Sequence, residues 1–139
     1  MAVDSVYIPE EGARAAMDAW MGDTALGPAH AHLTDEAKAW NPALTLADLH
    51  EASFTGYAVL NAVWGVAFTN GGGKAQTDSN NLLWTFTGGA GTTPVFAVYL
   101  TDAADSILLA YIPLIAPEIL TPGSPNFSRV ISLTGISEL

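Results

Sequence analysis

The chain has 139 residues, with 14 Asp and Glu against 4 Lys and Arg, and it contains no cysteine. Four scattered cations at a net charge of −10 exclude the clustered basic surface that binds nucleic acids or anionic membranes. Without cysteine, disulfides, thiol catalysis and zinc–thiolate sites are excluded as well. The length suits a single domain covering residues 1–139.

The N-terminal part predicts an extended arm over residues 1–8 and a helix over residues 9–21. Pro9 suits the first helical position, and the two acidic residues after it favour the positive end of the helix dipole. Gly22 supplies a stop signal. Apolar residues at helical spacing predict one buried face: Ala13, Ala16, Met17, Trp20 and Met21. The arm lacks the basic and apolar regions of a secretory signal, so we expect a soluble product made in a cytoplasm.

Short strands are predicted after the helix. Residues 29–34 alternate, with Ala29, Ala31 and Leu33 expected to face inward. Residues 35–45 predict a loop, and the segment 46–52 is either a short helical turn or irregular. Apolar runs separated by Gly, Pro, Asn and Asp predict six further strands, at 54–63, 64–69, 82–87, 95–101, 107–114 and 128–136.

These elements predict a mainly β fold, an antiparallel β-sandwich or jelly roll with one N-terminal α-helix. The strand at 95–101 is apolar on both faces, which indicates a central strand that is covered twice. We expect the second cover to be either the N-terminal helix or another subunit.

His30 and His32 are the candidate metal ligands. Their spacing places both imidazoles on one face of the predicted strand 29–34. Three side chains could complete a metal site with them: Asp35, Glu36 and His50. Alternatively, the two imidazoles lie on the solvent side of an edge strand. Because the sequence positions no third ligand, we predict no metal and no other cofactor.

Other loops offer little chemistry. The run Gly71-Gly72-Gly73-Lys74 resembles a phosphate-binding loop, but Ala75 replaces the required hydroxyl residue, so we expect a hairpin tip. Asp102 and Asp105 flank another predicted turn with too few oxygen ligands for calcium. No nucleophile elbow is present, and we therefore predict a non-enzymatic protein.

Charged residues make up only 13% of the chain, so uncharged polar residues must form much of the surface. Such a surface packs against protein without removing water from many ions, which favours a homo-oligomer. The arm, an aromatic residue beside Asn41-Pro42 and the long loop 70–81 are the expected contact regions. The residues expected to make these contacts are Val6, Tyr7, Ile8, Trp40, Gly72 and Lys74.

Three stretches carry a family resemblance: LADL at 46–49 continuing into EASFTGYA at 51–58, VYLTD at 98–102, and the LTPG turn at 120–123. In these stretches the chain resembles small virion proteins of tailed phages, from which it departs in its longer 70–81 loop. The resemblance implies no catalytic residues.

The resemblance implies a virion component that is made in the host cytoplasm. The first expectation is a head decoration (cement) protein. Such a protein would form an oligomer, with a trimer favoured, and would clamp the major capsid protein or another virion protein. A tail- or fibre-associated subunit with a receptor or glycan contact through Trp40 is the alternative. A small metal-dependent enzyme built on His30 and His32 comes third.

Overall fold

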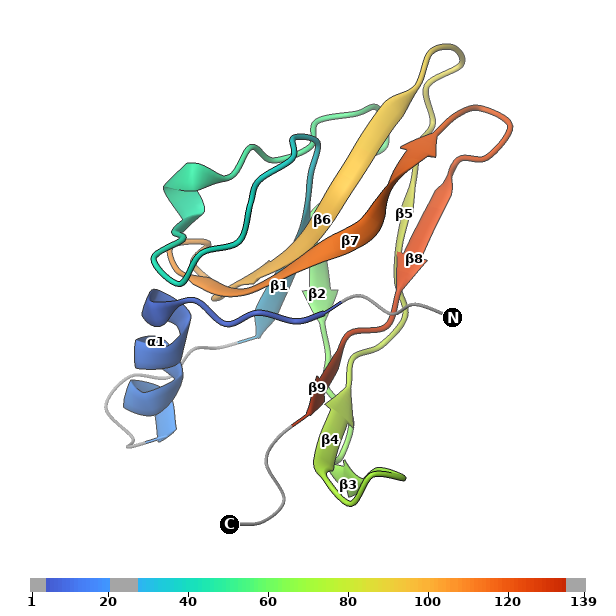
Figure 1. The fold of residues 1–139 in the computed structure, drawn as a ribbon. Coiled ribbons are helices and arrows are strands. Elements are labelled where there is room, and N and C mark those ends of the chain that lie inside the picture. The colour runs from blue at the N-terminus through green and yellow to red at the C-terminus, as the bar shows by residue number, and fades with distance from the viewer. Residues whose placement is uncertain (1–4, 21–27, 135–139) are drawn as a thin grey trace.

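The computed structural model describes residues 5–20 and 28–134 (Figure 1). Its elements are α1 (Glu10–Trp20), β1 (Ala29–Thr34), the 3-10 turn η1 (Leu46–Asp48), β2 (Leu60–Ala62), β3 (Phe68–Thr69), β4 (Ala75–Asp78), β5 (Leu82–Thr85), β6 (Thr93–Thr101), β7 (Leu108–Leu120), β8 (Asn126–Arg129) and β9 (Ser132–Thr134). The predicted mainly β class with one N-terminal helix is confirmed. No helix in the described ranges is long and apolar enough to cross a membrane.

Two layers enclose the main core. The larger layer is an antiparallel sheet in the order β2-β1-β6-β7, and the smaller is the antiparallel pair β5-β8. Both layers contribute buried side chains to one cluster, among them Leu33, Trp84, Val98, Ile112, Leu120 and Phe127. The packing is sandwich-like, as predicted, whereas the jelly-roll topology stays a prediction.

The central position predicted for residues 95–101 is confirmed, because β6 lies between β1 and β7. Val98 and Leu100 enter the main core, and Ala97 and Tyr99 enter a second cluster on the opposite face. The cover of that second face comes from the loop before and at η1, which contributes the buried Leu44, and not from α1. The loop therefore covers the second face of β6, as expected for a strand that is apolar on both faces.

Helix α1 forms where it was predicted, but the predicted buried face is wrong. Gly12 and Ala15 are buried, and the helix contacts β7. In contrast, Ala13 of the predicted face is only half-buried, Ala16 is exposed and Met17 is 64% exposed. The small residues allow the helix backbone to approach the strand closely, and this outweighs the larger apolar side chains. The side chain of Trp20 and the predicted helix end at 21–22 lie outside the described residues.

Gly12→Ala should destabilise the protein, although alanine normally favours a helix. A Cβ at position 12 would lie 2.6 Å from the Leu109 carbonyl oxygen, and Glu11 beside it accepts a 2.8 Å hydrogen bond from the Leu108 amide. We expect a loss of about 1–3 kcal/mol in unfolding free energy from this overpacking, measured by denaturant titration. Gly71→Ala is the control, because a Cβ there meets no described atom within 4 Å. Equal stability of the two variants would contradict the helix placement.

Several strand boundaries differ from the prediction. The predicted strand 54–63 is reduced to β2, because Gly56 adopts a φ of +95° in a turn closed by the hydrogen bond from the Tyr57 amide to the Phe54 carbonyl. The predicted strand 64–69 is reduced to β3. The open alternatives for 46–52 resolve into the single turn η1 followed by irregular backbone.

The C-terminal strands also differ. The predicted strand 107–114 is longer, since β7 continues through Pro113 to Leu120. Proline is tolerated there because β7 is an edge strand of its sheet. The predicted strand 128–136 is divided into β8 and β9, and its last two residues lie outside the described part of the chain.

A third sheet, in the order β3-β4-β9, extends away from the two layers (Figure 1). The prediction of a loop over residues 70–81 is wrong in part, because this segment contains strand β4. The β4 sequence, Ala-Gln-Thr-Asp, has no large apolar side chain that would indicate a strand. The Gly-rich stretch is the tip of the β3–β4 hairpin, as predicted, and Gly73 there has a φ of +77°. None of the residues in these three strands is buried.

Candidate functional site

His30 and His32 lie on the same face of β1, as the spacing predicted, but the alternative that this face is solvent-exposed on an edge strand is wrong. Strand β1 is internal, between β2 and β6. The His32 side chain is buried, with the residue 4% exposed, and its ring stacks on Tyr99 at a centroid distance of 4.8 Å and an interplanar angle of 6°. One imidazole is therefore held in a packed environment.

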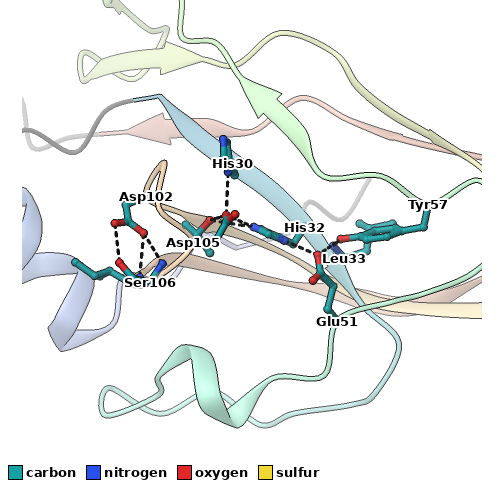
Figure 2. Close-up of polar contacts among 10 residues, drawn as sticks. His30, His32, Leu33, Glu51, Tyr57, Asp102, Asp105 and Ser106 are labelled. Atoms are coloured by element: carbon teal, nitrogen blue, oxygen red, sulfur yellow. Dashed lines mark hydrogen bonds and ion pairs between the residues drawn. The ribbon is translucent and has the colours of Figure 1, made fainter.

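Asp105 is the third member of this cluster, and sequence reasoning did not connect it with the histidines. Its Oδ1 lies 2.9 Å from His30 Nδ1 and 3.1 Å from His32 Nε2 (Figure 2). The Thr101 hydroxyl lies 2.9 Å from His32 Nε2 and donates to the same Asp105 oxygen at 2.8 Å. The antiparallel register of β1 with β6 brings these groups together by placing His30 opposite Thr101.

The turn between β6 and β7 aims Asp105 at the histidines. The Asp102 carboxylate accepts hydrogen bonds from the Ser106 amide at 2.8 Å, the Ser106 hydroxyl at 2.9 Å and the Ile107 amide at 3.0 Å. Burial opposes ionisation of Asp102, but these hydrogen bonds outweigh it and keep its pKa below the usual range. Within this turn Asp105 adopts a φ of +55°, which non-glycine residues rarely do.

The same cluster favours the ionised form of Asp105. Burial acts to raise the pKa of this carboxyl, whereas hydrogen bonds from Thr101, His30 and His32 lower it, and the net pKa lies below the usual value. The carboxylate is thus a negatively charged group facing two imidazoles at the end of β1.

A second carboxylate holds the opposite side of the His32 ring. His32 Nδ1 lies 2.5 Å from Glu51 Oε2, and the Tyr57 hydroxyl donates to the same oxygen at 2.6 Å (Figure 2). The Leu33 amide in turn donates to the Tyr57 hydroxyl at 3.1 Å. Burial and the hydrogen bond to Glu51 raise the pKa of Tyr57 far above its usual value, so this hydroxyl remains a donor. Both nitrogens of His32 therefore face carboxylate oxygens.

The predicted companions of the histidines form a separate cluster. Asp35, Glu36 and His50 lie close together on the irregular segment after β1 and after η1, and His50 Nδ1 lies 2.6 Å from Asp35 Oδ1. The expectation that they would complete a site with His30 and His32 is therefore wrong. The reason is chain direction, since the segment after β1 carries Asp35 and Glu36 away from His30.

The stabilisation contributed by the Asp35–His50 pair is expected to depend on pH. The hydrogen bond and charge of Asp35 raise the pKa of His50 above its ordinary value of 6.5. Because the folded-state pKa is raised, the stabilisation by this pair is complete below 6.5 and is lost as pH rises through the folded pKa. We expect Asp35→Asn to lower the His50 midpoint measured by NMR titration, with Glu36→Gln as the milder control. An unchanged midpoint in Asp35→Asn would contradict the pairing.

The residues expected to make intermolecular contacts lie in two regions, the N-terminal arm with the Trp40 ring that stacks on it and the tip of the β3–β4 hairpin. Val6 packs against the main core, and Tyr7 pairs with Tyr111 of β7 through backbone hydrogen bonds of 2.9 and 2.8 Å. The Tyr7 ring stacks on Trp40 at 5.0 Å, and Ile8 is exposed. Residues 5–8 thus lie along their own sheet edge, while 1–4 of the predicted arm lie outside the described residues.

In the second region, Gly72 and Lys74 lie exposed at the tip of the β3–β4 hairpin. Trp40 is half-buried, and its ring also stacks on Tyr111 at 6.5 Å. This packing occupies part of the indole that was expected to be a free contact surface. Gly72, Lys74 and Ile8 are therefore the exposed residues among these predicted contacts that make no ring stack.

An apolar hollow of about 660 Å³ lies between α1 and the ends of β1, β2 and β6. Gly12, Ala16, Ala62 and Trp64 are among the residues that line it. Its described lining includes no titratable side chain, so it offers no acid, base or nucleophile. The His30, His32 and Asp105 cluster is the described site with the greater chemical capacity, because it brings two nitrogen donors and one carboxylate together. Comparison with protein-family models, with curated proteins and with solved structures finds no match to this chain.

Proposed function

We propose that the protein is a non-enzymatic structural component of a virion, a decoration protein that reinforces a tailed-phage head as an oligomer. The observation that carries this proposal is the β3-β4-β9 sheet, in which no residue is buried. Phe68 of this sheet is 47% exposed, and Val66 just before it is 92% exposed. Leu133 of β9 packs against the main core, but no residue of the face that carries Phe68 belongs to that core. A small sheet with so little covered apolar surface is marginally stable in water, so a partner would supply the missing burial.

The chemistry of the sheet favours a protein partner. Phe68, Gln76 and Thr134 are neighbours across the three strands, so their side chains share one face, and none of them is charged. Strand β3 is an edge strand of the described sheet, with backbone groups available for pairing with another chain. Burying this surface costs little desolvation of ions, in keeping with the low charged share of the whole chain.

The mechanism would be avidity. Each sheet offers a small contact area, and an oligomer, for which we propose a trimer, would engage several sites of the major capsid protein at once. The exposed tip with Gly72 and Lys74 extends this surface beyond the two core layers. The assembly would therefore gain stability from many weak contacts and without catalysis.

Quantitative mass spectrometry of purified particles tests the location. A decoration protein is expected in copy numbers comparable to those of the major capsid protein. A copy number of only a few per particle would overturn the head assignment and favour the tail- or fibre-associated alternative. Absence of the chain from particles that are otherwise complete would overturn both.

A further inference from the structure

We infer that His30, His32 and Asp105 bind a divalent transition-metal ion of the zinc class, at a site separate from the proposed contact sheet. The site would join β1 to the turn between β6 and β7, two segments far apart in the sequence. This inference does not depend on the proposed virion function.

The three donor atoms converge from separate parts of the fold. His30 Nδ1 and His32 Nε2 lie 2.9 and 3.1 Å from the same Asp105 oxygen, and all three atoms lie within 4.8 Å of one another. Tetrahedral zinc with bonds of about 2.0–2.1 Å holds neighbouring ligand atoms about 3.4 Å apart. The two distances from Asp105 Oδ1 to the imidazole nitrogens, 2.9 and 3.1 Å, would each need to lengthen by only a few tenths of an ångström to match this spacing.

The surroundings of His32 provide an independent argument. The second ring N–H of a metal-binding histidine usually donates to a carboxylate, a backbone carbonyl or water, which fixes the ring orientation and increases ligand basicity. His32 Nδ1 makes this contact with Glu51 at 2.5 Å, and Tyr57 holds Glu51 in place at 2.6 Å. Stacking on Tyr99 further restricts the ring, so Nε2 is the nitrogen presented to the site (Figure 2).

Asp105 is oriented by its turn and by a hydrogen bond to its side chain. Its left-handed backbone conformation, with a φ of +55°, is maintained by the hydrogen bonds to Asp102 within the turn. The Thr101 hydroxyl holds its ligand oxygen at 2.8 Å. These contacts place the carboxylate beside both imidazoles before any ion binds.

The donor set also indicates the class of ion. Two imidazole nitrogens and one carboxylate suit Zn²⁺ and similar divalent ions, whereas Ca²⁺ and Mg²⁺ prefer oxygen ligands alone. The side chains of His30 and Asp105 are 24% and 45% exposed, so an ion can enter and a water molecule can complete its coordination. Without an ion the same atoms hydrogen-bond among themselves, and binding must therefore be measured directly.

The test is calorimetric titration of the full chain with Zn²⁺ after removal of metal with EDTA, supported by Co²⁺ absorption spectra. We expect one bound Zn²⁺, a higher melting temperature with Zn²⁺, and no such shift with Mg²⁺ or Ca²⁺. His30→Gln and Asp105→Asn should each remove most of the binding. Asparagine tolerates the left-handed backbone at position 105, so the turn should remain folded.

Two further variants distinguish binding at this site from binding elsewhere on the chain. Glu51→Gln should weaken Zn²⁺ binding by about 10- to 100-fold, because Glu51 orients His32 without touching the ion. His50→Gln is the matched control in the neighbouring exposed cluster and should bind like the parent. The inference is overturned if the parent chain does not bind Zn²⁺, if both His30→Gln and Asp105→Asn retain full affinity, or if His50→Gln loses it.

Discussion

Phe127→Ala should lower the free energy of unfolding by about 3–5 kcal/mol, the range for deleting a fully buried aromatic side chain. Phe127 is 0% exposed in β8, and its ring lies 5.9 Å from the Trp84 ring of β5. The Arg129 guanidinium covers the ring at 4.4 Å. Because Phe127 joins the smaller layer to the main core, its removal leaves a cavity between the two layers.

Leu83→Ala is the control for Phe127→Ala, since Leu83 lies in the same two-stranded sheet but is 47% exposed. Denaturant titration of both variants should show only a small loss of unfolding free energy for Leu83→Ala. An exposed position contributes about 0.5 kcal/mol, and the buried part of the Leu83 side chain adds to this. Similar losses in the two variants would contradict the assignment of Phe127 to the interior between the layers.

If the β3-β4-β9 sheet is the proposed contact surface, the double variant Val66→Asp/Phe68→Asp should abolish self-association and attachment to particles while leaving the fold intact. Neither side chain is buried in the protomer, so two carboxylates there remain hydrated as long as the chain is alone. In an interface the same carboxylates would lose water without gaining partners, which is costly. Sedimentation velocity and co-sedimentation with particles measure the two losses.

Leu83→Asp provides the comparison for this second prediction, because Leu83 has the same exposed fraction as Phe68, 47%, but lies in the β5-β8 pair. We expect it to associate like the parent chain. If the double variant assembles normally with an unchanged melting temperature, the contact sheet is wrong. Far-UV circular dichroism verifies that both variants are folded.

The sequence was a good guide wherever burial produced a strong pattern. Strand β6 is apolar on both faces and lies at the sheet centre, and the alternation in β1 correctly placed Ala31 and Leu33 inward. Strand β4 has no large apolar side chain to place on a buried face, so hydrophobic alternation could not reveal it. Hydrophobic patterning thus finds the core strands and also indicates β3 and β9, which lie within the predicted strands 64–69 and 128–136, but it misses β4.

The face of α1 was mispredicted for a related reason. Gly12 and Ala15 contribute little to an apolar pattern, yet their small size decides the helix orientation through close backbone approach. The Asp105 contact was not accessible from local patterns either, because it depends on the pairing of β1 with β6. The acidic turn after β6 was visible in the sequence, but its partner strand was not.

Amine-directed cross-linking of intact particles, followed by mass spectrometry, tests the proposed contact surface most directly. Lys74 lies at the exposed tip of the β3–β4 hairpin. Lys38 is exposed on the loop after β1, so it serves as an internal control for cross-linking at Lys74. We predict that Lys74 forms cross-links to another virion protein or to a second copy of the chain, while Lys38 is mainly modified without cross-linking. Cross-links from Lys38 alone, with Lys74 modified but unlinked, would contradict the account.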